Sequence, residues 1–316
     1  MGKKILKSLQ SVEYEHEFDK KALMALKQTA GFDMLVRQFN KIWSDKIVKI
    51  QVTGSYLKVS ERNFPEIHKA LEQCCTILDV KDIPNLYICW GDDINAFTAG
   101  VEEPIIVINS ACVDRLSHEE LMFILGHELG HIKSEHVLYG QMAKYLPMIG
   151  EIIGSATLGI GKLLSQALML ALMNWYRMSE FTADRAGLLA CQNVEAAAIA
   201  TIKCAGLPQK YVNDANIEEF KNQAKEFENF DYDGLGKLAK LFSSSYNTHP
   251  WSVMRAAEMY KWVDKDYEEI VDRVILNEDN HYILCSECNT KMRVPKMNGT
   301  ATITCPTCKL KFEQKL

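Results

Sequence analysis

Two histidines inside an apolar stretch constrain the folding of this chain more than any other feature. His127 and His131 belong to the segment His-Glu-Leu-Gly-His, and the residues before it, 121–126, are mostly apolar. Apolar spacing predicts a helix over residues 118–139. Positions four residues apart share one helix face, so both imidazoles can bind one ion. Because these polar groups lie at the edge of a core, they need partners from elsewhere in the fold.

The chemistry of the histidine pair points to zinc. Zinc binds imidazole nitrogen and needs three protein ligands if a fourth position is to stay open for water. Glu128 follows the first histidine directly, where its carboxylate can accept a proton from that water. Glu180 begins a strongly helical stretch and is the best candidate for the third ligand. Asp184 lies one turn later and could accept a hydrogen bond from a ligand histidine, although spacing alone favours a surface cluster of charged residues.

The ten cysteines fall into two groups. Four near the C-terminus form two Cys-x-x-Cys pairs, Cys285 with Cys288 and Cys305 with Cys308. This is the spacing of a closed, structural four-cysteine zinc site, in which metal supplies much of the folding energy of a small module. Asn298-Gly299 predicts a hairpin turn between the pairs. A pair of redox dithiols is the alternative. The other six cysteines are expected to be buried thiols in a reducing compartment.

Periodicity and turn residues predict an α+β fold, mainly helical around a small mixed sheet, plus a small β zinc ribbon. Helices are expected over residues 17–45 with a break at Gly31, 64–79, 118–139, 175–192, 194–205, 216–228 and 251–263, and strands at 46–59, 85–90, 95–100 and 105–108. Ser117 and Glu120 form a predicted capping box before the histidine helix. The predicted domains are an N-terminal helical and strand extension at 1–60, a main domain at 61–276 and the four-cysteine module at 281–316.

Charge excludes some classes of partner. The formal net charge of −5 leaves no basic surface for nucleic acid and no polybasic cluster for an anionic membrane. The first residues lack the apolar core of a secretory signal, so we expect a cytoplasmic protein.

Residues 146–175 are unusually apolar for a surface connection. Glu151, Lys162 and Gln166 interrupt them, and two membrane crossings of about 20 apolar residues each do not fit between the predicted ligands. We therefore expect an amphipathic helix or helical hairpin that covers the cleft at the metal. Peripheral membrane contact, or a homo-oligomer formed through this segment, is the alternative.

Taken together, His127–His131, the Glu180-x-x-x-Asp184 pattern and Thr248-His249-Pro250 resemble the M48 family of metallopeptidases, which includes HtpX-type and Ste24-type membrane proteases. Asn95-Ala96-Phe97 also matches, and the resemblance covers roughly residues 60–265. It implies a gluzincin-type domain in which His127, His131 and Glu180 hold zinc, Glu128 is the general base and His249 stabilises the oxyanion.

The predicted function is a zinc-dependent endopeptidase with one catalytic and one structural zinc ion. Its substrate is a protein or peptide, which could add as an extended strand next to Asn95, Ala96 and Phe97. One alternative is a non-catalytic member of the same fold that acts as a chaperone or adaptor. Another is a zinc amidohydrolase with a small substrate. The intact Glu128 favours catalysis, because a binding scaffold does not need a base beside the metal.

Overall fold

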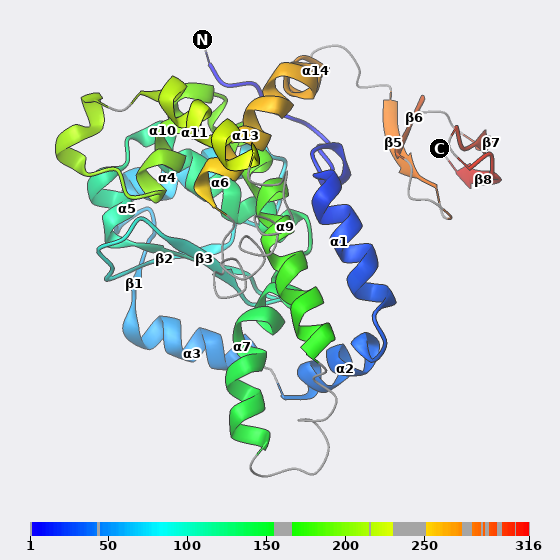
Figure 1. Cartoon of the computed structure of the whole chain (residues 1–316), viewed down its shortest axis with the longest axis horizontal. Coiled ribbons are helices and arrows are strands. Elements are labelled where there is room, and N and C mark those ends of the chain that lie inside the picture. The colour runs from blue at the N-terminus through cyan, green and yellow to red at the C-terminus, as the bar shows by residue number, and fades with distance from the viewer. Residues whose placement is uncertain are drawn as a thin grey trace. The chain divides into compact units, whose positions relative to one another are not determined.

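The computed structural model describes residues 2–42, 45–154, 166–214, 216–229, 251–273, 280–285, 287, 291–295, 299–306 and 308–315. These residues are mainly helical (Figure 1) and form two compact units, Met1–Lys265 and Asp266–Leu316, called here the larger and the smaller unit. The helices of the larger unit are α1 (Glu17–Gln28), α2 (Phe32–Ile42), α3 (Asp45–Ser55), α4 (Pro65–Ile77), α5 (Ser110–Arg115), α6 (His118–Lys133), α7 (Val137–Gly154), α9 (Gln166–Cys191), α10 (Val194–Cys204), α11 (Ile217–Asn229) and α13 (Ser252–Trp262).

A small mixed sheet lies within the larger unit. Its strands are β1 (Leu57–Lys58), β2 (Asn85–Cys89), β3 (Ala96–Ala99) and β4 (Ile105–Asn109), in the spatial order β1-β2-β4-β3. β2 and β4 are parallel, with Asn85 opposite Ile105, whereas β1 and β3 run antiparallel to their neighbours. The apolar residues of the central strand β4 are buried, as a strand covered on both faces requires. β3 ends this sheet and contacts α6.

Three glycines allow α6 and α9 to pack closely. A Cβ added at Gly130 of α6 would lie 2.6 Å from the Cβ of Ala186 on α9. One added at Gly187 would lie 2.7 Å from the carbonyl oxygen of Phe123, and one at Gly126 would meet Ala190. No side chain fits at these points, so the helix backbones approach each other directly. This contact brings the face of α9 that carries Glu180 against the histidines of α6.

The helix that carries the histidines starts as predicted but ends earlier. Ser117 accepts a hydrogen bond from the backbone of Glu120, whose carboxylate accepts one from the backbone of Ser117, so the capping box is confirmed. α6 ends at Lys133 and α7 begins at Val137, so the prediction of one helix to residue 139 was wrong. Glu135 between them has a φ of 59°, a left-handed conformation that ends a helix. Glycine is the usual residue at such a position, so Glu135 gave no sequence signal for the helix end.

The predicted strand at 46–59 was also wrong. Residues Asp45–Ser55 form α3, and only Leu57–Lys58 pair as a strand. Val48 and Val52, four residues apart, are buried in a cluster with apolar residues of β2, β3 and β4. Burial of one helix face has therefore outweighed the β-propensity of the branched side chains. The helices predicted at 64–79, 194–205, 216–228 and 251–263, and the strands at 85–90, 95–100 and 105–108, are confirmed within two residues.

Part of the apolar segment 146–175 belongs to the core. Leu168, Leu172 and Trp175 of α9 are buried in a cluster with residues of α1, α2 and α7, and α1 lies alongside α9 (Figure 1). Residues 155–165 lie outside the described part of the chain. Of the helices in the described part, none has the length and hydropathy needed to cross a membrane.

The smaller unit contains α14 (Glu268–Arg273), β5 (Asn280–Leu284), β6 (Lys291–Pro295), β7 (Thr300–Thr304) and β8 (Lys311–Lys315). β5 pairs with β6 and β7 pairs with β8, each antiparallel. Cys285 directly follows β5, and Cys305 and Cys308 lie in the connection between β7 and β8. Asn298 of the predicted turn lies outside the described residues.

Candidate active site

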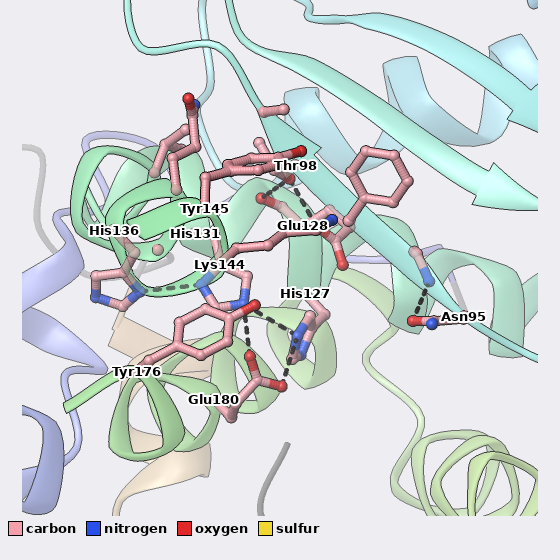
Figure 2. A pocket seen from close by; sticks show the side chains of 16 residues that line it. Asn95, Thr98, His127, Glu128, His131, His136, Lys144, Tyr145, Tyr176 and Glu180 are labelled. Atoms are coloured by element: carbon pink, nitrogen blue, oxygen red, sulfur yellow. Dashed lines mark hydrogen bonds and ion pairs between the residues drawn. The ribbon is translucent and has the colours of Figure 1, made fainter. Parts of the chain in front are cut away.

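Three potential ligand atoms converge where α6 meets α9. Nε2 of His127 lies 3.2 Å from Nε2 of His131. Glu180 of α9 places one carboxylate oxygen 3.5 Å from Nε2 of His127 and the other 3.3 Å from Nε2 of His131. Figure 2 shows the three side chains pointing toward one another. His127 and Glu180 are buried, so bulk water does not supply the hydrogen bonds of the imidazole and the carboxylate.

This donor set fits a tetrahedral zinc ion. Ligand atoms about 2.0–2.1 Å from zinc, at the corners of a tetrahedron, lie about 3.3–3.4 Å from one another. The two imidazole nitrogens, 3.2 Å apart, match that edge length, and each lies 3.3–3.5 Å from a different carboxylate oxygen of Glu180. Two imidazoles and one carboxylate are also a ligand set of zinc enzymes that keep a fourth position for water. Burial lowers the pKa of His131, which favours the neutral imidazole that zinc binds.

Asp184 contacts the other ring nitrogen of His127. Its Oδ1 lies 3.0 Å from Nδ1 of His127 and accepts the proton on that nitrogen, so Nε2 is the ring nitrogen that a cation would take. Burial lowers the pKa of His127, but the carboxylates of Asp184 and Glu180 outweigh burial and raise it to about 10. In the absence of a cation, these carboxylates therefore hold a proton on His127.

Arg255 of α13 is a charged partner that sequence analysis missed. Its Nε donates to Oδ2 of Asp184 at 2.7 Å, and its Nη1 lies 3.4 Å from Oε2 of Glu180. Burial raises the pKa of Asp184, but Arg255 and His127 outweigh burial and lower it. Arg255 and Asp184 are 71 positions apart, and no local spacing rule connects them.

Glu128 lies beside the three converging atoms. It is buried, and the hydroxyl of Thr98 on β3 donates to its Oε2 at 2.6 Å, as Figure 2 shows. The sequence did not single out Thr98, although its neighbours Asn95, Ala96 and Phe97 were candidates. The sheet edge therefore holds the carboxylate in one orientation.

A pocket of about 220 Å³ opens at Glu128. The predicted substrate residues Asn95, Ala96 and Phe97 line it together with His127, His131 and Glu180. α7 supplies a facing wall, where Nζ of Lys144 lies 4.2 Å from the centroid of the Phe97 ring, within cation–π range. Tyr145 and Tyr176 also line the pocket and were not foreseen. His249, the predicted oxyanion residue, lies outside the described residues.

The second cluster of potential ligands is in the smaller unit. The thiols of Cys285, Cys305 and Cys308 lie within 4.8 Å of one another, and Sγ of Cys285 is 3.4 Å from Sγ of Cys308. These distances are far longer than a disulfide bond and suit separate ligands of one ion. Cys288 lies outside the described residues. Among the six other cysteines, Cys89 is half-buried and Cys204 is exposed, contrary to the expectation that all six are buried.

Comparison with known proteins defines the class. The model of peptidase family M48 matches residues 61–263, which is most of the chain. The chain therefore belongs to family M48, as the sequence resemblance predicted. Its relatives are named as metallopeptidases and proteases, and the chain is a hydrolase of this kind.

Several relatives are similar to the chain over different lengths. The plastoglobule-localized metallopeptidase 48, chloroplastic, of Arabidopsis thaliana is 26% identical over 273 residues, which are 85% of this chain and 78% of that protein. Protease HtpX homolog 2 of Methanosarcina mazei is 29% identical over 123 residues, 38% of this chain and 41% of that protein. The chain thus spans less than half the length of this HtpX relative. No solved structure matches the chain.

Proposed function

We propose that the chain is a zinc-dependent endopeptidase of the gluzincin type, with His127, His131 and Glu180 as zinc ligands. The observation that carries this proposal is the convergence of two imidazole nitrogens, 3.2 Å apart, and the Glu180 carboxylate beside the buried Glu128. Family membership independently supports peptidase chemistry. As in the relatives, the substrate is a protein or peptide.

Bound zinc supplies a Lewis acid that polarises a carbonyl and lowers the pKa of water toward neutrality. Glu128 then acts as general base and later returns the proton to the leaving amine. The hydroxyl of Thr98 bonds Oε2 of Glu128, which fixes the carboxylate plane and leaves Oε1 for proton transfer. We further propose that His249 stabilises the oxyanion.

The edge of the sheet suits an extended peptide. In the described sheet β3 pairs only with β4, so its other edge has backbone groups to which a substrate strand can add. Asn95, Ala96 and Phe97 follow this edge into the pocket. The proposal is that these residues bind substrate backbone while the pocket receives a side chain next to the cleaved bond.

Glu128→Gln tests this mechanism directly. The amide cannot accept the proton, so casein cleavage should fall by at least about 10²-fold, the usual scale of general base catalysis. Zinc content should stay at the wild-type level, because residue 128 is not a ligand. Glu66→Gln, at an exposed position of α4, is the matched control. Full activity of Glu128→Gln would overturn the mechanism.

Two further assays separate the alternatives. A chelator should abolish casein cleavage by the wild type, and added zinc should restore it. Cleavage of small amides without cleavage of casein or peptides would favour an amidohydrolase. Zinc binding without any hydrolysis would favour a chaperone or adaptor.

We also propose that Cys285, Cys288, Cys305 and Cys308 bind a second, structural zinc ion within a ribbon at residues 281–316. The proximity of three of the thiols supports this. The main domain is proposed to span residues 61–276, after the extension at 1–60.

The proposed location is the cytoplasm, with membrane contact or a homo-oligomer formed through residues 146–175 as an additional feature. The resemblance to HtpX-type and Ste24-type membrane proteases motivates the proposal of membrane contact, as does the apolar composition of residues 146–175. Fractionation of native cells without detergent tests it, since full recovery in the soluble fraction removes membrane anchoring.

A further inference from the structure

His136 connects His131 to a carboxylate from the N-terminal part of the chain. Nδ1 of His136 lies 3.2 Å from Nδ1 of His131, and Nε2 of His136 lies 3.1 Å from Oδ2 of Asp19. Figure 2 shows the contact between the two imidazoles. His136 and Asp19 are both buried. Asp19 lies on α1, outside the residues 61–263 that match the family model.

The end of α6 holds His136 in place. The backbone N–H groups of Glu135 and His136 donate to the carbonyl oxygens of Ile132 and His131, respectively. With Glu135 in the left-handed region, these two bonds form a Schellman motif. The backbone of His136 is thus bonded to the carbonyl of His131 itself, and the two ring centroids lie 5.3 Å apart.

Asp19 is anchored by donors from α9. Nε1 of Trp175 donates to Oδ1 at 2.9 Å, and the hydroxyl of Thr182 donates to Oδ2 at 2.7 Å. Burial raises the pKa of Asp19, but His136, Thr182 and Trp175 outweigh burial and lower it. Asp19 is therefore a carboxylate that only accepts hydrogen bonds.

The donor and acceptor roles of these groups favour one arrangement of protons. Because Asp19 only accepts, Nε2 of His136 carries a proton and donates it. When Nε2 carries the only ring proton of His136, its Nδ1 accepts the Nδ1–H of His131. Nε2 of His131 is left with a bare lone pair, directed at His127 and Glu180.

We propose that Asp19 and His136 are positioning residues that fix the ring orientation and tautomer of His131 for zinc binding. The proposal rests on the proposed function, because it takes His131 as a zinc ligand. Asp184 orients His127 directly, whereas His131 is oriented through His136 by a helix from the N-terminal extension. The extension is then part of the metal site, although it lies outside the matched family region.

The test uses the full-length variants His136→Gln and Asp19→Asn. Glutamine cannot form the imidazole bridge, and asparagine offers one acceptor oxygen to the three donors that converge on Asp19. Each variant should weaken zinc binding by about 10- to 100-fold, the usual effect of losing the outer partner of a ligand histidine. Competition with a chromophoric chelator measures the dissociation constant. His118→Gln and Asp33→Asn, at exposed positions of α6 and α2, are matched controls and should bind zinc as the wild type does.

His131→Ala supplies the reference for the site. Zinc that remains bound in this variant belongs to the smaller unit and is subtracted. Thermal melting of the metal-free proteins identifies folded variants, and if Asp19→Asn does not fold, His136→Gln decides the outcome. A merely structural role would lower the melting temperature and leave the dissociation constant of the folded protein unchanged.

Dissociation constants of the folded variants within about twofold of the wild type would overturn the positioning role. If His131→Ala loses zinc in the same experiment, the proposed ligand set still stands. If His131→Ala retains the full wild-type zinc content, the ligand set itself is wrong.

Discussion

At the scale of single residues, each important side chain depends on one partner that is distant in sequence. Thr98 donates a hydrogen bond to Glu128, Asp184 accepts one from His127, and Arg255 donates one to Asp184. The motif residues could be identified from spacing, because both histidines lie on one helix. Thr98 and Arg255 could not, because their contacts join residues from separate elements, whereas Asp184 was a candidate from its position one turn after Glu180. Removing one member of a buried charged pair leaves the other uncompensated, which typically destabilises by about 3–5 kcal/mol.

The carboxyl group of Glu258 makes the free energy of unfolding depend on pH. Burial raises the pKa of its carboxyl, but hydrogen bonds from His16 and Lys261 outweigh burial and lower it from 4.5 to about 2. Because the folded-state pKa is the lower one, the stabilisation is complete above the unfolded pKa and is lost as the pH falls toward the folded one. Glu258→Gln should therefore lower the free energy of unfolding at neutral pH, and its difference from the wild type should shrink below the unfolded pKa.

Urea denaturation across this pH range measures the effect. Glu226→Gln, at an exposed position of α11, provides the comparison for a solvent-exposed glutamate. A difference between Glu258→Gln and the wild type that stays constant with pH would contradict the expectation.

At the scale of elements, the contact between α6 and α9 assembles the site. Gly126, Gly130 and Gly187 leave no room for a side chain between these helices. The sequence predicted both helices but not the distance between them, because an isolated glycine in a helix does not indicate which element packs against it. The small residues of the interface determine how close Glu180 comes to the histidines.

Gly130→Ala tests this contact. The added methyl would meet Ala186 at 2.6 Å, so the helices must separate, at about 1–3 kcal/mol for overpacking. We expect a lower free energy of unfolding and weaker zinc binding, because Glu180 moves with α9. Gly54→Ala is the control, since nothing lies within 4 Å of its added methyl. It should stabilise α3 by up to about 1 kcal/mol. Identical behaviour of the two variants in urea denaturation would show that close packing is not needed.

At the scale of the whole molecule, the chain forms two compact units, each with its own core and its own cluster of ligand atoms. The larger unit buries many apolar side chains, whereas the core of the smaller one is formed around Cys285, Met292 and Cys305. So small a core gives little stability alone. The smaller unit should therefore depend on metal for folding far more than the larger one does.

Cys305→Ser separates the two sites. We expect zinc content to fall from about two to about one ion per chain, since one closed site is lost. The smaller unit should become sensitive to limited proteolysis, while casein cleavage continues. Cys204→Ser, an exposed cysteine of the larger unit, is the matched control and should keep both ions. Unchanged zinc content in Cys305→Ser would exclude the four-cysteine site.

The sequence by itself determined the features that depend on neighbouring residues. These are the histidine pair on one helix face, the capping box at Ser117 and the positions of the strands at 85–90, 95–100 and 105–108. Periodicity and turn chemistry act over a few residues and can be recognised without the fold. Tertiary structure alone decided that Asp45–Ser55 is a helix, that α6 stops at Lys133, and that Arg255, Thr98 and Asp19 reach the site. These outcomes depend on burial against distant segments. The free energy of that burial exceeds the local helix and strand propensities of the residues.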